Sequence, residues 1–224
     1  MGMRYWFCLA LTLTACGLTH AADISGTVQV MKKGGKSTLS DFANAVVYIA
    51  GVKVTAPTAT LTMAQRDKTF LPRLLPLVQG QSVDFLNEDE VQHSVFSTDA
   101  QFDLGRYGKG QHKTIVFNQL GQFKVYCNIH QNMISDILVL ENPYFSLTDA
   151  QGHYRISQVP AGQYTLKAWH IYGGEASQPL TVGATDLQQD FTLVSKKVVR
   201  EITQHHNKDG QSYPSGYAPD EAHY

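Results

Sequence analysis

Short apolar runs separated by turn residues constrain the fold of this 224-residue chain more than any other feature. The runs before residue 141 are rich in Val, Ile, Phe or Tyr and lie between Gly, Asn and Asp signals: ADISGTVQV, NAVVYIAGVKV, SVDFLN, HSVFS, KTIVFN, GQFKVYC and SDILVL. Such runs are typical of β-strands, and no stretch carries a sustained apolar stripe at helical spacing. The sequence therefore predicts an all-β protein, with its strands in an antiparallel sandwich or barrel.

A second block of strand patterns follows this first one. Turns are expected at 149–152 and 160–162, with strands around them and two further strands at QPLTVG and DLQQDFTLV, enough for a small sandwich. After that the aliphatic residues become rare, and Gly and Pro breaks indicate a mobile tail. We therefore predict one domain over 23–142, a small β-sandwich over 143–195 and a polar, disordered tail over 196–224.

The N-terminus has the plan of a secretory signal peptide. One arginine is followed by an apolar run and by small residues that end at Ala21 and Ala22. This run is too short and wrongly flanked to span a membrane. We prefer cleavage after Ala21 or Ala22, with residues 1–21 as the signal peptide. However, LTAC also resembles a lipobox, in which Cys16 would be lipidated. No later run can cross a bilayer, so the sequence predicts a periplasmic protein without a membrane span, either soluble or lipid-anchored.

Removal of the signal peptide leaves Cys127 as the only cysteine of the three in the chain. No internal disulfide can then form, and a free thiol in an oxidising compartment is open to stray disulfides and oxidation. The formal net charge changes only from −1 to −2, because one arginine and no acidic residue is lost. So small an imbalance argues against nucleic acid or an anionic membrane surface as a partner.

Cys127 lies in a cluster of soft metal donors, YCNIHQNM. It ends an alternating strand, and His130 and Met133 lie in the loop that follows. Thiolate, imidazole and thioether are ligands that copper prefers. The trigonal copper site of two His and one Cys with a distant Met needs one more imidazole. His93 is the candidate, since it follows an acidic turn and opens another alternating run.

Other interpretations of this cluster account for fewer of its residues. Taken singly, Cys127 could be a small buried hydrophobe and Met133 a core side chain. Zinc fits less well because a thioether is a poor zinc ligand, and haem attachment needs a Cys-x-x-Cys-His motif, which is absent. A Cys-His hydrolase would leave Met133 without a role, and a copper oxidase would need further histidine clusters.

With these four residues in place, the sequence resembles the cupredoxins, the blue copper proteins. NEDEVQH before YCNIHQNM looks like their ligand segments, and the Cys-x-x-His-x-x-Met loop is similar to that of amicyanin. The likeness is closer to bacterial periplasmic cupredoxin-domain proteins often labelled methylamine utilization proteins, through QRDKTFLPRLLPLVQGQSVDFLNEDEVQHSVFS, CNIH and ILVLENPYF. TDAQGHYRISQVPAGQYTLKAWH is similar to the carboxypeptidase-regulatory-like sandwiches of that group.

The resemblance implies a Greek-key β-sandwich over 23–142, with a carboxypeptidase-regulatory-like sandwich over 143–195. It implies one type 1 copper ion bound by His93, Cys127, His130 and Met133. The protein would be a periplasmic one-electron carrier rather than an enzyme, cycling between Cu(I) and Cu(II) with a protein redox donor and acceptor in the cell envelope. The alternative is a copper-binding protein for sensing, storage or delivery, and a third reading is an adhesive or scaffold protein. No residue shows a link to methylamine.

Several details near the ligands stay open. Gln131, Asn132 and Ser94 depart from the pattern of the family, and Ser94 is expected to tie the two ligand segments together by a side-chain hydrogen bond. The acidic turn before His93 could steer a basic redox partner, although a solvated turn explains it equally well; it consists of Glu88, Asp89 and Glu90. We expect His170 to be packed in the second sandwich, and the tail histidines 205 and 206 to be solvated rather than bound to a second metal.

Overall fold

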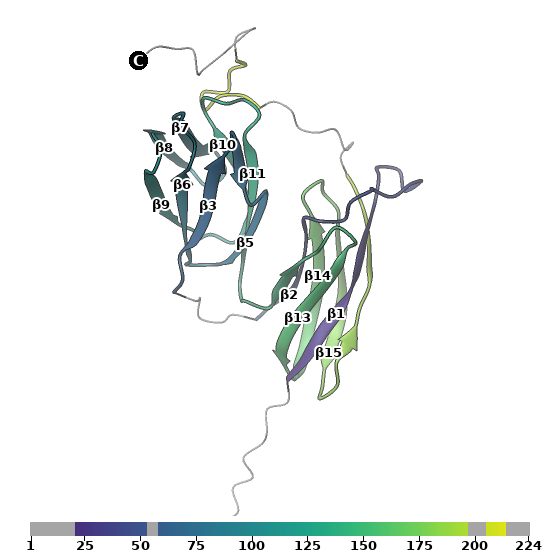
Figure 1. Cartoon of the computed structure of the whole chain (residues 1–224). Coiled ribbons are helices and arrows are strands. Elements are labelled where there is room, and N and C mark those ends of the chain that lie inside the picture. Colours follow the sequence, from purple (N-terminus) through teal and green to yellow (C-terminus); the bar gives the residue numbers. More distant parts are fainter. Residues whose placement is uncertain (1–20, 53–57, 197–204, 214–224) are drawn as a thin grey trace, which may run out of the picture.

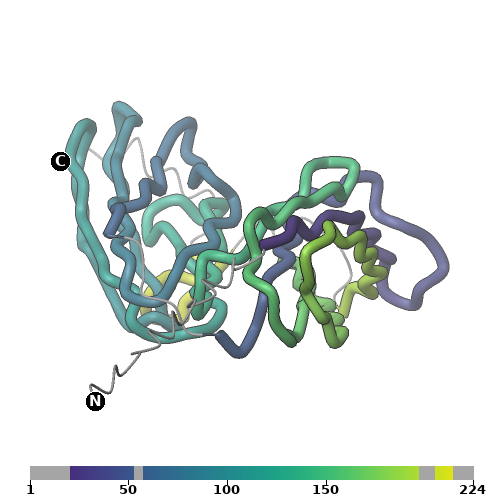
Figure 2. The backbone as a smooth tube through the Cα atoms, turned by 90° about the horizontal axis from the view of Figure 1, so that it is seen from below, coloured from purple at the N-terminus to yellow at the C-terminus, as the bar shows by residue number. Residues whose placement is uncertain are grey.

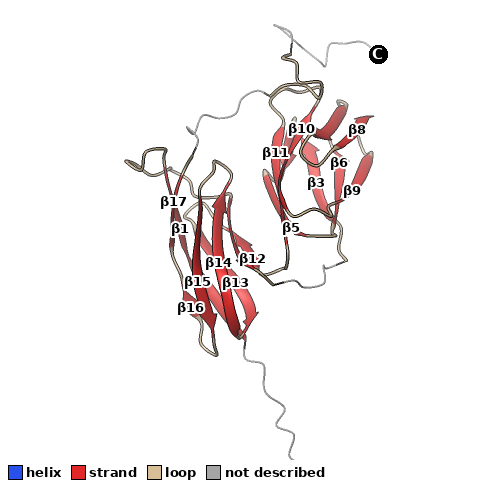
Figure 3. Ribbon diagram, turned by 180° about the vertical axis from the view of Figure 1, so that it is seen from behind, coloured by secondary structure: helices blue, strands red, loops and turns tan. Residues whose placement is uncertain are grey.

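Two β-sandwiches lie side by side in the computed structural model, which describes residues 21–52, 58–196 and 205–213 (Figures 1 and 2). The described part of the chain consists of strands and loops without a helix (Figure 3). This confirms the predicted all-β fold. None of the described residues forms a helix of the length and apolarity that crossing a membrane requires. The predicted signal peptide, with Cys16, lies outside the described residues except for Ala21.

One sandwich, here called the inserted sandwich, is built from strands between residues 61 and 140. Its five-stranded sheet has the order β5-β11-β10-β7-β8 and faces a four-stranded sheet of order β4-β3-β6-β9. Pairings such as β6 with β9 and β7 with β10 join strands that are not consecutive, as in Greek-key sandwiches. The strands are β3 (Leu61–Arg66), β4 (Thr69–Leu71), β5 (Leu74–Val78), β6 (Ser82–Asn87), β7 (His93–Ser97), β8 (Phe102–Tyr107), β9 (His112–Val116), β10 (Gly121–Cys127) and β11 (Ile134–Leu140).

The other sandwich, here called the host sandwich, combines the two ends of the described chain. One sheet has the order β12-β2-β14-β15, and in the other β1 lies between β13 and the short strands β16 and β17. Its strands are β1 (Ala21–Met31), β2 (Ala45–Ala50), β12 (Phe145–Leu147), β13 (His153–Pro160), β14 (Gly162–His170), β15 (Glu175–Val182), β16 (Leu187–Gln188) and β17 (Phe191–Val194).

The boundary expected at residue 142 is therefore wrong for the N-terminal strands. β1 pairs with β13, and β2 pairs with β12 and β14, so both belong to the host sandwich and not to the domain predicted over 23–142. Both are inner strands of their sheets, and Ile24 and Val47 are completely buried in the host core. Sequential strands often pair with each other, but here the partners lie about a hundred residues apart along the chain.

Four strands were not expected from the sequence: β3, β4, β5 and β8. β4 has only three residues, β5 contains Pro76, and β8 contains Gly105 with a φ of 64°. Proline and glycine weaken a strand pattern, so only pairing with neighbouring strands makes these segments extended. β5 pairs with the buried strand β11, and β3 pairs with β6.

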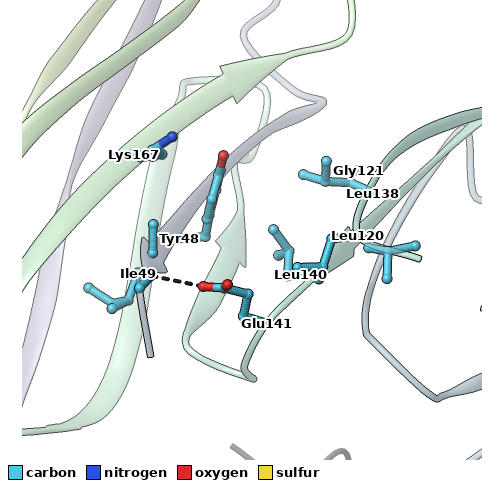
Figure 4. Close-up of a pocket in the computed structure, with 11 residues that line it drawn as sticks. Tyr48, Ile49, Leu120, Gly121, Leu138, Leu140, Glu141 and Lys167 are labelled. Carbon is cyan, nitrogen blue, oxygen red and sulfur yellow. Dashed lines mark hydrogen bonds between the residues drawn. The ribbon is translucent and has the colours of Figure 1, made fainter. Parts of the chain in front are cut away.

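The two sandwiches contact each other through an apolar cluster. Leu74, Leu138 and Leu140 of the inserted sandwich pack with Val46 and Ile171 of the host. Beside this contact lies an open pocket of about 390 Å³, and residues of both sandwiches line it (Figure 4). Among its lining residues, the backbone N–H of Gly51 donates to the Glu141 carboxylate at 2.9 Å. The contact holds the inserted sandwich against the sheet that contains β2 and β14.

Candidate metal centre

Three of the predicted ligands converge at one end of the inserted sandwich. His93 is the first residue of β7 and Cys127 the last residue of β10, and these antiparallel strands are neighbours. His130 lies in the loop that runs from β10 to β11. His93 and Cys127 are fully buried, and His130 is only 7% exposed. Antiparallel pairing thus brings together ligands that are 34 residues apart in the sequence.

The donor atoms of these three side chains face one another. Cys127 Sγ lies 3.7 Å from His93 Nδ1 and 3.5 Å from His130 Nδ1, and the two Nδ1 atoms are 3.1 Å apart. The imidazole rings are tilted by 60°, with centroids 4.8 Å apart. No other group of three His, Cys, Asp or Glu side chains in the described ranges brings its donor atoms together in this way.

This triangle has the size of a metal coordination plane. With bonds of about 2.0 Å to imidazole nitrogen and about 2.3 Å to thiolate sulfur, trigonal geometry separates N and S by about 3.7 Å and the two nitrogens by about 3.5 Å. The observed edges of 3.1 to 3.7 Å are close to these values. Two imidazoles and one thiolate form a donor set that fits one copper ion.

Met133 belongs to the same buried apolar cluster as Cys127 and is 1% exposed. Its backbone bonds to both loop ligands: the Cys127 N–H donates to Met133 O at 3.2 Å, and the Met133 N–H donates to His130 O at 3.0 Å. The loop is therefore a closed turn that fixes Cys127, His130 and Met133 relative to one another. Its short Cys-x-x-His-x-x-Met spacing makes both bonds local.

His93 is oriented from behind by a carboxylate that the sequence did not single out. Asp89 Oδ2 lies 2.8 Å from His93 Nε2. An ionised carboxylate can accept hydrogen bonds but cannot donate them. His93 Nε2 therefore carries the proton, and Nδ1 presents its lone pair to the donor triangle. Burial alone would raise the pKa of Asp89, but hydrogen bonds from the N–H of Lys68, from His93 and from the N–H of Asp67 lower it on balance. Asp89 is therefore ionised at neutral pH.

The acidic turn before His93 is thus divided among different partners. Glu88 forms an ion pair with Arg66 at 2.6 Å, and Glu90 forms one with Lys109. Only the side chain of Asp89, 12% exposed, points toward the donor cluster. The two open interpretations of this turn, partner steering and simple solvation, both leave out this contact with His93. No feature of the sequence pattern distinguishes Asp89 from its acidic neighbours.

The backbone of Ser94 ties the two ligand segments together. The Asn128 N–H donates to Ser94 O at 2.7 Å. Burial raises the pKa of the Cys127 thiol, although the backbone N–H groups of Ser94, Ile129 and His130 oppose this shift. The sulfur therefore keeps its proton in the metal-free protein, and binding of a metal ion releases it. The tie expected from the Ser94 side chain is made here by its main chain.

The C-terminal segment, residues 205–213, lies on the ligand loop, residues 127–133. The prediction of a disordered tail is therefore wrong for this segment. His205 packs on Tyr126, with ring centroids 4.8 Å apart, and its N–H donates to Gln131 O at 3.0 Å. The Tyr213 hydroxyl donates to Cys127 O at 3.1 Å. The segment is polar in composition, but its donors face carbonyl groups of the loop, which a composition argument cannot show. The tail residues 197–204 and 214–224 lie outside the described part.

His170 has a structural role, as expected. It is 1% exposed in the host sandwich, its Nε2 lies 3.1 Å from Ala43 O, and its Nδ1 accepts the Tyr172 N–H at 3.3 Å. Both ring nitrogens of the neutral imidazole are thereby satisfied. Burial lowers the pKa of His170, while the bond to Ala43 and the charge of Asp41 oppose the shift.

No protein-family model matches this chain, and no curated protein matches it. Solved structures do resemble it. A copper-containing nitrite reductase from Thermus scotoductus SA-01 shares 27% identity over 42% of this chain, with a TM-score of 0.36. The chain covers 25% of that enzyme's length.

Two smaller proteins among the similar structures are matched over nearly their whole length. A novel purple cupredoxin from Nitrosopumilus maritimus shares 20% identity over 35% of this chain and 98% of its own, with a TM-score of 0.33. Amicyanin from Paracoccus versutus shares 19% identity over 42% of this chain and 96% of its own, also at 0.33. Solved structures similar to this chain thus include cupredoxins. These TM-scores are too low to support an argument about the metal, so the inference that this chain binds copper rests on its own donor set.

Proposed function

We propose that this chain is a periplasmic cupredoxin that binds one type 1 copper ion and carries one electron. His93, Cys127, His130 and Met133 would hold the copper ion. The observation that carries the proposal is the convergence of one thiol and two imidazole nitrogens within 3.1 to 3.7 Å of one another in a buried site. When bound, copper supplies the change between Cu(I) and Cu(II).

The burial of the site supports electron transfer over catalysis at the metal. His93 and Cys127 are fully buried, and Met133 is 1% exposed, so a substrate has no open approach to the donor atoms. An electron needs no such opening. His130, at 7%, is the most exposed of the four residues, and we infer that the electron enters and leaves through its ring. A protein donor and a protein acceptor in the cell envelope would then dock near the β10–β11 loop.

The bonding around the site supports a centre whose geometry changes little between oxidation states. Asp89 fixes the tautomer and the ring direction of His93 at 2.8 Å, and backbone bonds within the loop fix Cys127 and Met133. Little rearrangement then accompanies the gain or loss of an electron, which suits a carrier.

Copper loading and reversible reduction test the proposal. The purified mature protein, loaded with Cu(II), should show the intense visible band of a thiolate bound to Cu(II). The band should disappear with a reductant and return with an oxidant. Absence of the band would exclude the type 1 site. A band that returns only when copper is exchanged with a second protein would favour copper delivery, the alternative function.

Two variants assign the ligands in this experiment. Cys127→Ser should lose the band completely, because the thiolate creates it. His153→Gln is the matched control: its imidazole is 63% exposed in the host sandwich and pairs with Asp149, so the band should be unchanged. Retention of the band in Cys127→Ser would show that the ligand assignment is wrong. N-terminal sequencing of the exported protein would distinguish cleavage near Ala21 from lipidation at Cys16.

A further inference from the structure

Most hydrogen bonds between the C-terminal segment and the rest of the described chain reach the ligand loop. The Tyr213 hydroxyl donates to the carbonyl of Cys127 at 3.1 Å, and the Lys208 N–H donates to Asn128 Oδ1 at 2.8 Å. The His205 N–H donates to the carbonyl of Gln131 at 3.0 Å. Three donors of the segment thus reach three residues of the loop, 127, 128 and 131.

The segment is shaped by its own hydrogen bonds. Asn207 Oδ1 accepts the N–H groups of Asp209 and Gln211, at 3.0 and 2.8 Å. The Asn207 N–H donates to Gln211 O, and the Gly210 N–H donates to Asn207 O. Gly210 has a φ of 76°, a conformation that favours glycine and lets the turn close. The segment is therefore a compact turn rather than an extended chain lying on a surface.

Aromatic rings anchor this turn to the sheet. The His205 ring lies on Tyr126, and Phe96 and Tyr213 flank it with centroid distances of 6.2 and 5.7 Å. Tyr126 and Phe96 are paired residues of β10 and β7, the two strands that carry Cys127 and His93. Lys208 adds an ion pair with Asp103 on β8, at 2.6 Å. The segment thus contacts the outer side of the strands whose other side carries the donor atoms.

The ligand loop would otherwise be held mainly by bonds on its inner side. The Asn128 N–H is bonded to Ser94, and the Cys127 and Met133 N–H groups are bonded within the loop. The carbonyl oxygen of Cys127 and the side-chain oxygen Oδ1 of Asn128 instead accept hydrogen bonds from the C-terminal segment. A carbonyl that bonds to water can turn with little cost, whereas one bonded to a fixed hydroxyl is held in direction.

We propose that the C-terminal segment clamps the ligand loop, and that Tyr213 is a positioning residue that acts on the metal centre through the main chain of Cys127. This inference rests on the proposed copper site. The clamp holds the direction of the peptide that carries the thiolate, and thereby the position of sulfur relative to the two imidazoles. A merely covering role would leave the spectrum and reduction potential of the centre independent of Tyr213.

Three full-length variants test the clamp. Tyr213→Phe removes the hydroxyl that donates to Cys127 O and keeps the ring beside His205. The double variant with His205→Ala also removes the ring that lies on Tyr126. Ser212→Ala is the matched control, since its hydroxyl lies 3.4 Å from His206 Nδ1, within the segment. Visible spectrum, reduction potential and rate of copper release to a chelator are measured for each variant.

We expect the double variant to release copper about 10-fold faster than the wild type, the lower end of the loss that follows removal of groups supporting metal ligands. Tyr213→Phe should shift both the visible band and the reduction potential, and Ser212→Ala should match the wild type. A band, potential and release rate equal to those of the wild type in the double variant would overturn the clamp.

Amide hydrogen exchange of the metal-free proteins separates this inference from the proposed function. The N–H groups of Cys127 and Asn128 should exchange faster in the double variant, because the loop that carries them is no longer held against their acceptors, Met133 O and Ser94 O. If the wild type failed to give a copper band, the proposed function would fail. Exchange rates in the loop that do not differ between wild type and double variant would overturn the clamp, whatever the result with copper.

Discussion

Replacement of Asp89 by asparagine should weaken copper binding by about 30-fold. Asp89 receives three hydrogen bonds: Oδ2 from His93 Nε2 at 2.8 Å and from the Lys68 N–H at 2.9 Å, and Oδ1 from the Asp67 N–H at 2.6 Å. All three partners are donors, which an ionised carboxylate can satisfy together. Asparagine has a single acceptor oxygen, so its NH₂ group must face at least one of these donors.

One orientation of the new amide disturbs the metal site, and the other disturbs the turn that holds residue 89. With NH₂ in the place of Oδ2, His93 has to accept at Nε2, and its proton moves to Nδ1, the atom that faces Cys127. With NH₂ in the place of Oδ1, it opposes the Asp67 N–H, and the turn before β4 loses its bond. Hydrogen bonds to charged groups contribute about 1.5 to 3 kcal/mol. A loss of about 2 kcal/mol corresponds to about 30-fold in the dissociation constant, within the 10- to 100-fold typical of such partners.

A competition titration against a coloured copper chelator measures this loss. Glu90→Gln is the matched control, because it removes the same negative charge at the next residue. The Glu90 side chain is 81% exposed and pairs with Lys109. It should bind copper as the wild type does. If Asp89→Asn stayed within about threefold of the wild type, the carboxylate would not control the tautomer of His93, and this reasoning would be refuted.

Two further predictions concern stability. Burial lowers the pKa of His170 despite the nearby charge of Asp41, so the unfolded chain, with an ordinary pKa of about 6.5, binds this proton first as the pH falls. His170 should not affect the free energy of unfolding above about pH 6.5, and below this pH the free energy should decrease by up to about 1.4 kcal/mol per pH unit. In urea unfolding at pH 5 to 7, the free energy of unfolding should depend less on pH in His170→Gln than in the wild type. Gly26→Ala should cost about 3 kcal/mol in urea unfolding, because the new Cβ would lie 1.8 Å from Gln189 O, while Gly183→Ala, with open space, should change little.

The ligands could be predicted from the sequence because their arrangement is largely local. Cys127, His130 and Met133 lie in one short turn, and the bonds that close this turn join residues only three to six positions apart. His93 could be found because it opens a strand beside an acidic turn, and its pairing with β10 then places it opposite Cys127. Most strands were also visible, since alternation and turn residues are properties of short windows.

Asp89 and Tyr213 could not be found in this way. The role of Asp89 depends on N–H groups of the β3–β4 turn, 22 positions earlier, and that of Tyr213 on a carbonyl 86 positions away. Composition describes the first as part of a solvated acidic turn and the second as part of a polar tail. Hydrogen-bond donors and acceptors carry no sequence signal for a partner so distant, because many side chains could fill the same position.

The sequence by itself determined the all-β class of this protein and the set of soft donors that converge in it, because both arise from local patterns of side chains. Tertiary structure decided which strands share a sheet. It placed β1 and β2 in the host sandwich, more than a hundred residues from β13 and β14. It also placed the C-terminal segment on the ligand loop. Such pairings depend on which apolar faces and backbone groups can be satisfied together in the whole fold, a condition that no short stretch of sequence contains.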